Sequence, residues 1–124
     1  MNVNDAKHAW LDDLLASIDE KNTDRFLRFL TDDAVFRFGS AAPVSGTESI
    51  RAAVDGFFST IAGSKHVLDN ILVEGGTLIC EGEVTYTRHD ESKITLPFAN
   101  IFEMEGDLIS HYKIYADAGP LYET

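Results

Sequence analysis

The hydrophobic positions in the first half of the chain recur every three or four residues, with polar and charged residues between them. This spacing is typical of amphipathic helices, and it predicts helices at residues 5–20, 22–30 and 47–61. Asn22 or the residue after it can cap the second helix, and Thr47 is expected to cap the third. The first half of the chain is therefore expected to be mainly helical.

The second half of the chain is rich in β-branched and aromatic residues, which favour strands. Short connections such as Gly75-Gly76 separate its hydrophobic runs, and such connections favour consecutive antiparallel hairpins. One earlier strand is expected at residues 34–38, followed by a loop at 39–46. The later strands are expected at residues 66–74, 77–88, 93–105 and 107–117.

Helices segregated from an antiparallel sheet define an α+β fold. The 124 residues suit a single domain spanning residues 1–124, and the 44 % hydrophobic and 25 % charged residues are typical of a packed globular protein. Ten Lys and Arg residues against 21 Asp and Glu residues give a net charge of −11. That charge repels phosphate backbones and anionic lipids, so neither nucleic acid nor a membrane surface is an expected partner.

The cysteine content and the first residues of the chain indicate a cytoplasmic protein. Cys80 is the single cysteine, so an intrachain disulfide is impossible, and its apolar surroundings in the sequence indicate a packing residue. The first residues contain neither a basic segment nor an apolar segment of the kind found in secretory signals. No apolar run approaches the roughly 20 residues of a membrane-spanning helix.

Several short motifs occur at the junctions between the expected elements. Residues 30–36, Leu-Thr-Asp-Asp-Ala-Val-Phe, join a helix to a strand, and Gly46 precedes Thr-Glu-Ser-Ile at the start of the third helix. His66 and Asn70 stand at the start of a strand, and Tyr-Ala-Asp at residues 115–117 is followed by Pro-Leu. Each motif is weak alone, but their order and spacing together are fairly specific.

Over residues 7–122 this order resembles the SnoaL-like branch of the nuclear transport factor 2-like superfamily. The resemblance implies a curved antiparallel sheet wrapped around three N-terminal helices into a cone, open at one end and holding a ligand-sized pocket. It also implies a homodimer formed through the outer face of the sheet. The expected fold is thereby narrowed to a cystatin-like α+β roll.

Two catalytic mechanisms found in the superfamily lack their residues here. The position of the general base in the ketosteroid-isomerase branch corresponds to Phe38, which cannot accept a proton. The limonene-epoxide-hydrolase branch holds a water with Tyr and Asn, where this chain has Phe36 and Phe38. Its Asp–Arg–Asp set corresponds to Glu81, Glu83 and Ile114, of which Glu83 alone keeps a carboxylate at an acidic position. Neither mechanism is expected.

The polyketide-cyclase branch uses an acidic residue on the last strand with a nearby histidine, and Asp117 and His111 are the nearest candidates. A carboxylate made more basic by apolar surroundings can remove a proton next to a carbonyl. If Tyr112, Ile114 and Ala116 face the cone, strand alternation points both candidates away from it unless a bulge intervenes. The alternative interpretation is that Asp117 forms a hydrogen bond to the backbone or to a helix end near the cone mouth.

Glu81 and Glu83 are two residues apart on one expected strand, so their side chains share a face. Two interpretations remain open: an acid–base pair in which Glu83 is catalytic, or a solvated face at a dimer rim. No histidine has the two-His-plus-carboxylate spacing of a metal site, and the sequence contains no phosphate loop or Gly-rich dinucleotide turn, so neither a metal nor a cofactor is expected.

The expected pocket lining is apolar and aromatic, with few polar groups. Asn100 shares a strand face with three apolar residues, and a buried amide there needs a partner or binds one. The chemistry suits a small apolar or polycyclic ligand. The expected ligand-binding residues are Trp10, Phe36, Phe38, Phe57, Leu96, Phe98, Asn100, Phe102, Tyr112 and Ile114.

Two functions are consistent with these residues. The first is a small-molecule pocket protein that binds an apolar or polycyclic ligand. In its catalytic form it is a cofactor-free isomerase or cyclase in which Glu83, Asp117 and His111 transfer protons. The second is a non-catalytic ligand-binding or dimerisation module, favoured because Phe36, Phe38 and Ile114 replace known catalytic positions.

Overall fold

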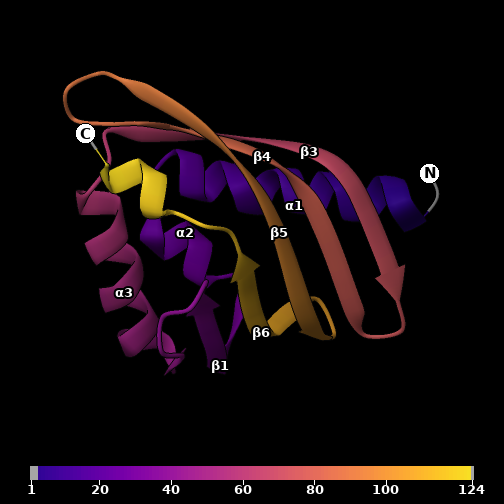
Figure 1. The fold of residues 1–124 in the computed structure, drawn as a ribbon. Helices are drawn as coiled ribbons and strands as arrows, with labels where there is room; N and C mark the ends of the chain where they lie inside the picture. Colours follow the sequence, from indigo (N-terminus) through magenta and orange to yellow (C-terminus); the bar gives the residue numbers. More distant parts are fainter. Residues whose placement is uncertain (1–2, 124) are drawn as a thin grey trace.

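The computed structural model describes residues 3–123, so residues 1, 2 and 124 of the expected domain lie outside the described part. Helices dominate its first half and strands its second (Figure 1). In chain order the elements are α1 (Val3–Asp19), α2 (Thr23–Leu27), β1 (Leu30–Phe38), β2 (Val44–Ser45), α3 (Thr47–Ser59), β3 (Gly63–Glu74), β4 (Thr77–Thr87), β5 (Lys93–Glu105), β6 (Leu108–Tyr115) and the 3₁₀ helix η1 (Gly119–Tyr122).

The strands form one six-stranded sheet in the order β2-β1-β6-β5-β4-β3. β3 to β6 pair consecutively and antiparallel, which confirms the predicted hairpins and the α+β fold class. β1 pairs in parallel with β6, a pairing that the sequence did not indicate. The long strands bend around α1 and α2, and α3 lies beside the β1 end of the sheet (Figure 1). The sheet is therefore a curved, unclosed wall around the helices.

Some element boundaries differ from the prediction, and tertiary pairing explains the differences. The second helix ends at Leu27 and not at residue 30, because Leu30 already pairs with Ile109 of β6. Residues 31–33, expected to end that helix, lie instead in β1, where the register shifts between Leu30 and Val35. The short strand β2 falls inside the predicted loop at 39–46 and pairs antiparallel with β1.

Helix caps were predicted correctly at α2 and wrongly at α3. The Asn22 side chain accepts a hydrogen bond from the backbone N–H of Arg25 at 3.1 Å, as expected for an N-cap. At α3 the cap residue is Gly46, whose φ of 86° lies in the region that glycine adopts without strain. The Thr47 hydroxyl donates instead to the backbone oxygen of Asp32 at 3.5 Å.

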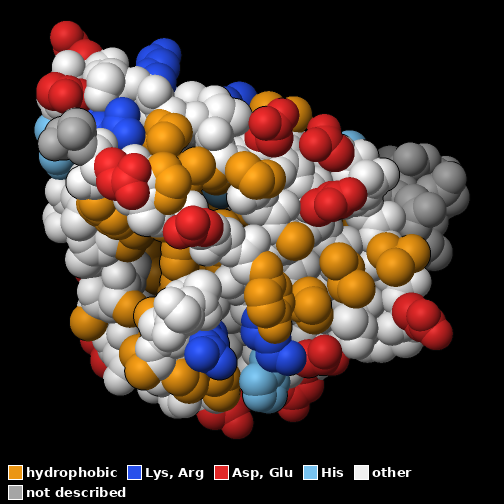
Figure 2. All heavy atoms as spheres, viewed as in Figure 1, with side chains coloured by type: hydrophobic (Ala, Val, Ile, Leu, Met, Phe, Trp, Pro, Cys, Tyr) orange, Lys and Arg blue, Asp and Glu red, His pale blue; other side chains and the backbone are white. Residues whose placement is uncertain are grey.

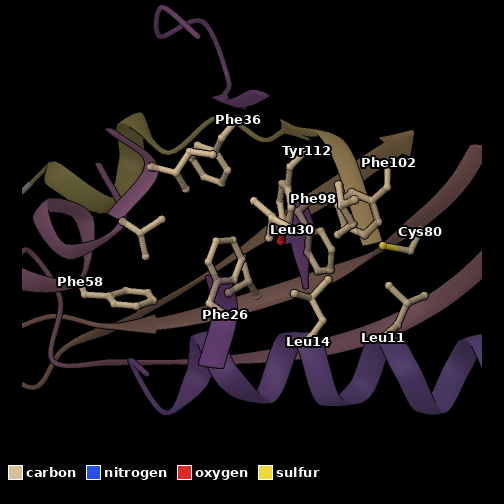
Figure 3. Close-up of a cluster of buried hydrophobic side chains, with 14 of the residues drawn as sticks. Leu11, Leu14, Phe26, Leu30, Phe36, Phe58, Cys80, Phe98, Phe102 and Tyr112 are labelled. Atoms are coloured by element: carbon tan, nitrogen blue, oxygen red, sulfur yellow. The ribbon is translucent and has the colours of Figure 1, made fainter. Parts of the chain in front are cut away.

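The hydrophobic core lies between α1 and the concave face of the sheet. Leu11 and Leu14 point from α1 toward Phe98 and Phe102 of β5 (Figure 3). Cys80 is fully buried in the same cluster, which agrees with its expected packing role. No helix among residues 3–123 is both long and apolar enough to cross a membrane.

Gly82 allows β3 and β4 to approach closely where the sheet bends. The register of this pair shifts between Leu68 and Asn70, opposite the glycine. A Cβ atom added at Gly82 would lie 1.9 Å from the backbone oxygen of Val67, closer than any stable contact. A side chain at position 82 therefore does not fit this strand pairing.

Candidate functional site

A cavity of about 240 Å³ lies between the concave face of the sheet and helices α2 and α3. On the face drawn in Figure 1 it corresponds to a hollow between α3 and β6, with hydrophobic side chains at its base (Figure 2). Most of its lining side chains are aliphatic or aromatic. A molecule inside it would leave water for an almost apolar wall, as in typical small-ligand sites.

The structure brings most of the predicted ligand-binding residues to this cavity. β1 contributes its residues through strand alternation, since Phe36 and Phe38 face the concave side while Arg37 between them is exposed. Contact with a ligand stays a prediction for each of them. The predicted residues that line the cavity are Phe36, Phe38, Phe57, Phe98, Asn100, Tyr112 and Ile114.

Trp10, Leu96 and Phe102 do not line the cavity. Trp10 packs edge-on against Phe29 and Phe102, with ring centroids 5.5 Å and 6.4 Å apart, at the closed end of the core. Phe102 is fully buried there and Leu96 is also buried. Leu96 and Phe102 lie on the concave face together with the lining residues of β5, whereas Trp10 belongs to α1 and packs over Phe102.

The three predicted catalytic residues are exposed and lie outside the lining of the cavity. Tyr112 and Ile114 face inward, so His111 points outward by alternation, without an inverting bulge between them. Glu83 and Asp117 border a shallow groove on the opposite face of the sheet. Asp117 accepts a hydrogen bond from the backbone N–H of Gly119 at 3.0 Å, as the alternative interpretation expected.

Asn100 is the polar residue that the sequence singled out, and its environment is unusual. The side chain is 3 % exposed on β5 and lines the cavity. Its Oδ1 atom is buried and has no hydrogen-bond partner among the described residues. An unpaired buried carbonyl oxygen costs about 1–3 kcal/mol, so this position is unfavourable unless something fills the cavity.

A histidine–aspartate pair that the sequence analysis missed lies at the cavity wall. His66 of β3 lines the cavity, and its Nδ1 lies 2.6 Å from Oδ1 of Asp19 at the end of α1. Asp19 also accepts hydrogen bonds from the backbone N–H of His66 at 3.0 Å and the hydroxyl of Ser64 at 2.8 Å. The imidazole stands edge-on to Phe98, with ring centroids 5.3 Å apart.

The pair is well buried, with 9 % of the His66 side chain and 17 % of the Asp19 side chain exposed. Burial alone raises the pKa of Asp19, but the hydrogen bonds and charge of His66, with help from Ser64, bring it below its usual value. Asp19 is thus held as a carboxylate that fixes the histidine ring. No local motif reveals this pair, because its members are separated by 47 positions.

The remaining polar groups of the cavity are two phenols. Tyr86 and Tyr112 both line it, and burial raises the pKa of each phenol well above its usual value. Both therefore stay neutral hydroxyls that can donate a hydrogen bond. The lining contains no Lys, Arg, Asp or Glu among the residues that the structure describes, so it offers no counter-charge to an ionic ligand.

No group of three or more His, Cys, Asp or Glu side chains within the described part of the chain is arranged to hold a metal ion. His66 and Asp19 form a two-residue hydrogen-bonded pair, which falls short of the ligand sets of protein metal sites.

Solved structures with the same fold differ widely from this chain in sequence. A nuclear transport factor 2-like protein of unknown function from Burkholderia pseudomallei aligns with a TM-score of 0.81 and 13 % identity over 92 % of each chain. TerC co-crystallised with polyporic acid aligns with a TM-score of 0.79 and 12 % identity over 92 % of this chain and 93 % of TerC. A putative SnoaL-like polyketide cyclase from Jannaschia sp. CCS1 aligns with a TM-score of 0.74 and 17 % identity over 90 % of this chain and 88 % of the cyclase chain.

At these identities the structures show a shared fold alone. No curated protein matches the sequence. The family model of the SnoaL-like domain matches residues 11–112, from the buried face of α1 to the inward-facing tyrosine of β6. The matched segment contains all the cavity-lining residues except Ile114 and Ala116 and covers most of the chain, and the chain therefore belongs to the SnoaL-like domain family.

Proposed function

We propose that the cavity binds one small, uncharged and largely apolar molecule. The observation that carries this proposal is the buried Asn100 oxygen, which has no hydrogen-bond partner within residues 3–123 and lies in a mostly apolar wall. A ligand that donates a hydrogen bond to this oxygen would remove its desolvation cost while burying its own apolar surface. The absence of acidic and basic side chains among the described lining residues supports an uncharged ligand.

The volume of the cavity limits the size of that ligand. About 240 Å³ is below the roughly 300–1,000 Å³ typical of drug-sized ligands, so we expect one or two rings and not a four-ring steroid. A hydroxyl or N–H group on the ring would reach Asn100. Among structural relatives, TerC was co-crystallised with polyporic acid, which supports a small-molecule ligand for this fold.

The bound molecule can have either of two fates, conversion by the protein or binding alone. The first is cofactor-free isomerisation or cyclisation by proton transfer, and a structural relative described as a putative polyketide cyclase supports it. The second is binding without conversion. Glu83 and Asp117 stand outside the cavity lining, which favours binding over catalysis by these two carboxylates. Loss of turnover of an identified substrate in E83Q or D117N would support catalysis by these outer carboxylates.

Ligand binding can be tested by blocking the cavity at an alanine of α3. Ala53 lines the cavity and its neighbour Ala52 does not, although both are exposed. We expect 1-naphthol, which has two rings and one hydroxyl donor, to raise the Tm of the wild-type protein and of A52W, but not of A53W. At a ligand concentration of 100 Kd the stabilisation is about 2.7 kcal/mol. Equal shifts in A53W and A52W would contradict binding in this cavity.

We also propose that two copies of the chain pair through the outer face of the sheet. Val67 and Leu72 on β3 and Tyr115 on β6 are each at least half exposed, and they belong to the face opposite the cavity. Covering such side chains is favourable in proportion to the apolar area removed from water. Light scattering coupled to gel filtration should give the dimer mass for the wild type and the monomer mass for V67E/Y115E. A wild-type monomer at micromolar concentration would refute the pairing.

A further inference from the structure

We propose that His66, held by Asp19, is the general base of this cavity and removes a proton from carbon in an uncharged bound molecule. The inference rests on the proposed function, since it requires a ligand in the cavity. It assigns catalysis to a different pair from the carboxylates Glu83 and Asp117. The two observations that carry it are the ring's place in the cavity lining and its short hydrogen bond to Asp19.

The hydrogen bond determines which nitrogen of His66 can accept a proton. Asp19 is a carboxylate that accepts three hydrogen bonds, so the bond at Nδ1 requires a proton on that nitrogen when the ring is neutral. Nε2 is then the atom with a free lone pair, and no hydrogen bond to it occurs among residues 3–123. A second group that orients a histidine base is the arrangement that general-base catalysis uses.

The surroundings of the pair suit a base that must return its proton to water. On the side away from the cavity, His66 and Asp19 border a surface groove. The charged groups around it are Asp12 of α1, Glu20 just after α1 and Lys65 of β3, and Tyr86 of β4 stands on the cavity side. The proton taken up at Nε2 stays compensated by the Asp19 carboxylate until the ring releases it.

The chemistry of the lining indicates the class of substrate. A neutral imidazole removes protons only from activated carbon, such as a C–H group next to a carbonyl or within an electron-poor heteroaromatic ring. The base takes the proton, the electron pair of the C–H bond moves toward the electronegative atom, and the imidazolium forms. Neutral Tyr86 or Tyr112 can donate to the oxygen that becomes more negative. The substrate class is therefore an uncharged carbon acid of one or two rings.

A probe that needs only a base can test this without the natural substrate. In 5-nitrobenzisoxazole, removal of the proton at C3 forms a nitrile as the N–O bond breaks, which opens the ring and converts the oxygen of the same molecule into a phenolate. Its 3-methyl analogue has no such proton and cannot react, so it reports binding alone. We expect saturable phenolate release by the wild-type protein, and NMR shifts of the cavity aromatics when the analogue binds.

The variants separate the base from the rest of the protein. H66Q should lose about 100-fold or more in kcat while still binding the analogue. H8Q is the matched control, because His8 also lies near an aspartate, Asp12 at 3.6 Å, but is exposed on α1. H8Q should react like the wild type. Circular dichroism melting of each variant shows whether H66Q is folded, and D19N supplies a second route if it is not.

Asp19 is a positioning residue, so its test is a pH profile. Without the carboxylate the imidazolium loses its compensating charge, and the rise of kcat with pH should move to lower pH in D19N as the maximum falls. A ¹⁵N spectrum of the wild type should show the neutral ring protonated at Nδ1. Turnover that persists in H66Q, an unchanged D19N profile, or a proton on Nε2 overturns the inference and leaves ligand binding intact. If the analogue shifts no cavity resonance while 1-naphthol does, the inference falls and ligand binding stands; if neither compound shifts any, both proposals fail.

Discussion

Asn100 on β5 is paired directly with Cys80 on β4, and both side chains are buried on the concave face of the sheet. Burial raises the pKa of the Cys80 thiol to about 11, although hydrogen bonds from Asn100 lower it in part. The Asn100 oxygen nevertheless has no hydrogen-bond partner in the described part of the chain. The protein therefore leaves the hydrogen-bonding capacity of this amide partly unused. As a result, the effect of the amide on stability can be measured separately from its effect on ligand binding.

Replacing this amide by a hydrocarbon of similar size should stabilise the ligand-free protein. In N100L no buried carbonyl is left unpaired, and we expect the free energy of unfolding to rise by up to about 1 kcal/mol. Urea denaturation measures this change. Binding of 1-naphthol should weaken in the same variant. A marked loss of stability in N100L would show that the amide is needed by the fold itself.

The Cys80 thiol should be unreactive as long as the protein is folded. It is fully buried, and a pKa of about 11 leaves almost no thiolate at pH 8. Alkylation by iodoacetamide should therefore proceed at the rate of global unfolding and rise steeply with urea. Free cysteine in the same buffer provides the reference rate. Rapid alkylation of the native protein at pH 8 would mean that the β4–β5 region opens locally.

Two phenylalanines on the concave face should differ strongly in their contribution to stability. Phe102 is fully buried in the closed end of the core, and F102A should cost about 3–5 kcal/mol. Phe38 is half-buried beside the existing cavity, so F38A should cost less than half as much. Equilibrium denaturation of both variants makes the comparison. Equal losses would indicate that the cavity is closed around Phe38 in solution.

Gly82 should tolerate no side chain. In G82A the new methyl group would meet the backbone oxygen of Val67, which cannot move without breaking the β3–β4 pairing. We expect a loss of about 1–3 kcal/mol, or more if the bend straightens. G56A on α3 is the control, because an added Cβ meets nothing there and alanine is the better helix former. A G82A protein as stable as the wild type would contradict the close approach.

The sequence revealed the fold because its signals are local. Helical spacing, the Gly75-Gly76 turn and the β-branched runs each specify one element from neighbouring residues, and the hairpins follow from short connections. The parallel pairing of β1 with β6 joins segments about 75 positions apart, such as Phe36 and Tyr112. No local pattern encodes such a contact, and it was not predicted.

The same distinction explains the outcome at the site. Alternation along one strand was enough to place Phe36, Phe38 and Asn100 on the cavity side. It could not tell which concave-face residues border empty space and which, like Phe102, are covered by Trp10. His66 and Asp19 come together because a strand crosses the end of a helix, a contact made by tertiary packing. The sequence drew attention to Glu83 and Asp117 because each is an acidic residue in or next to a strand, but both side chains are exposed to solvent.

The pKa of Asp19 makes acid stability a test of the pair that does not depend on any ligand. Hydrogen bonds and charge from His66 lower this pKa in the folded state despite burial, so the folded protein favours the carboxylate more than the unfolded chain does. The stabilisation is present in full above the unfolded pKa of about 3.9, and it is lost as the pH falls through the lower folded value. The difference in unfolding free energy between wild type and D19N should therefore be about 1–3 kcal/mol at pH 6 and shrink between about pH 4 and pH 2.

Urea denaturation at a series of pH values measures this difference directly. D12N is the matched control, since Asp12 is exposed on the same helix and lies 3.6 Å from an exposed His8. Its free energy of unfolding at pH 6 should stay within about 0.5 kcal/mol of the wild type. A D19N protein that keeps the same deficit at pH 2 as at pH 6 would show that the substitution acts through packing. The carboxylate would then not be the group that holds His66 at the cavity wall.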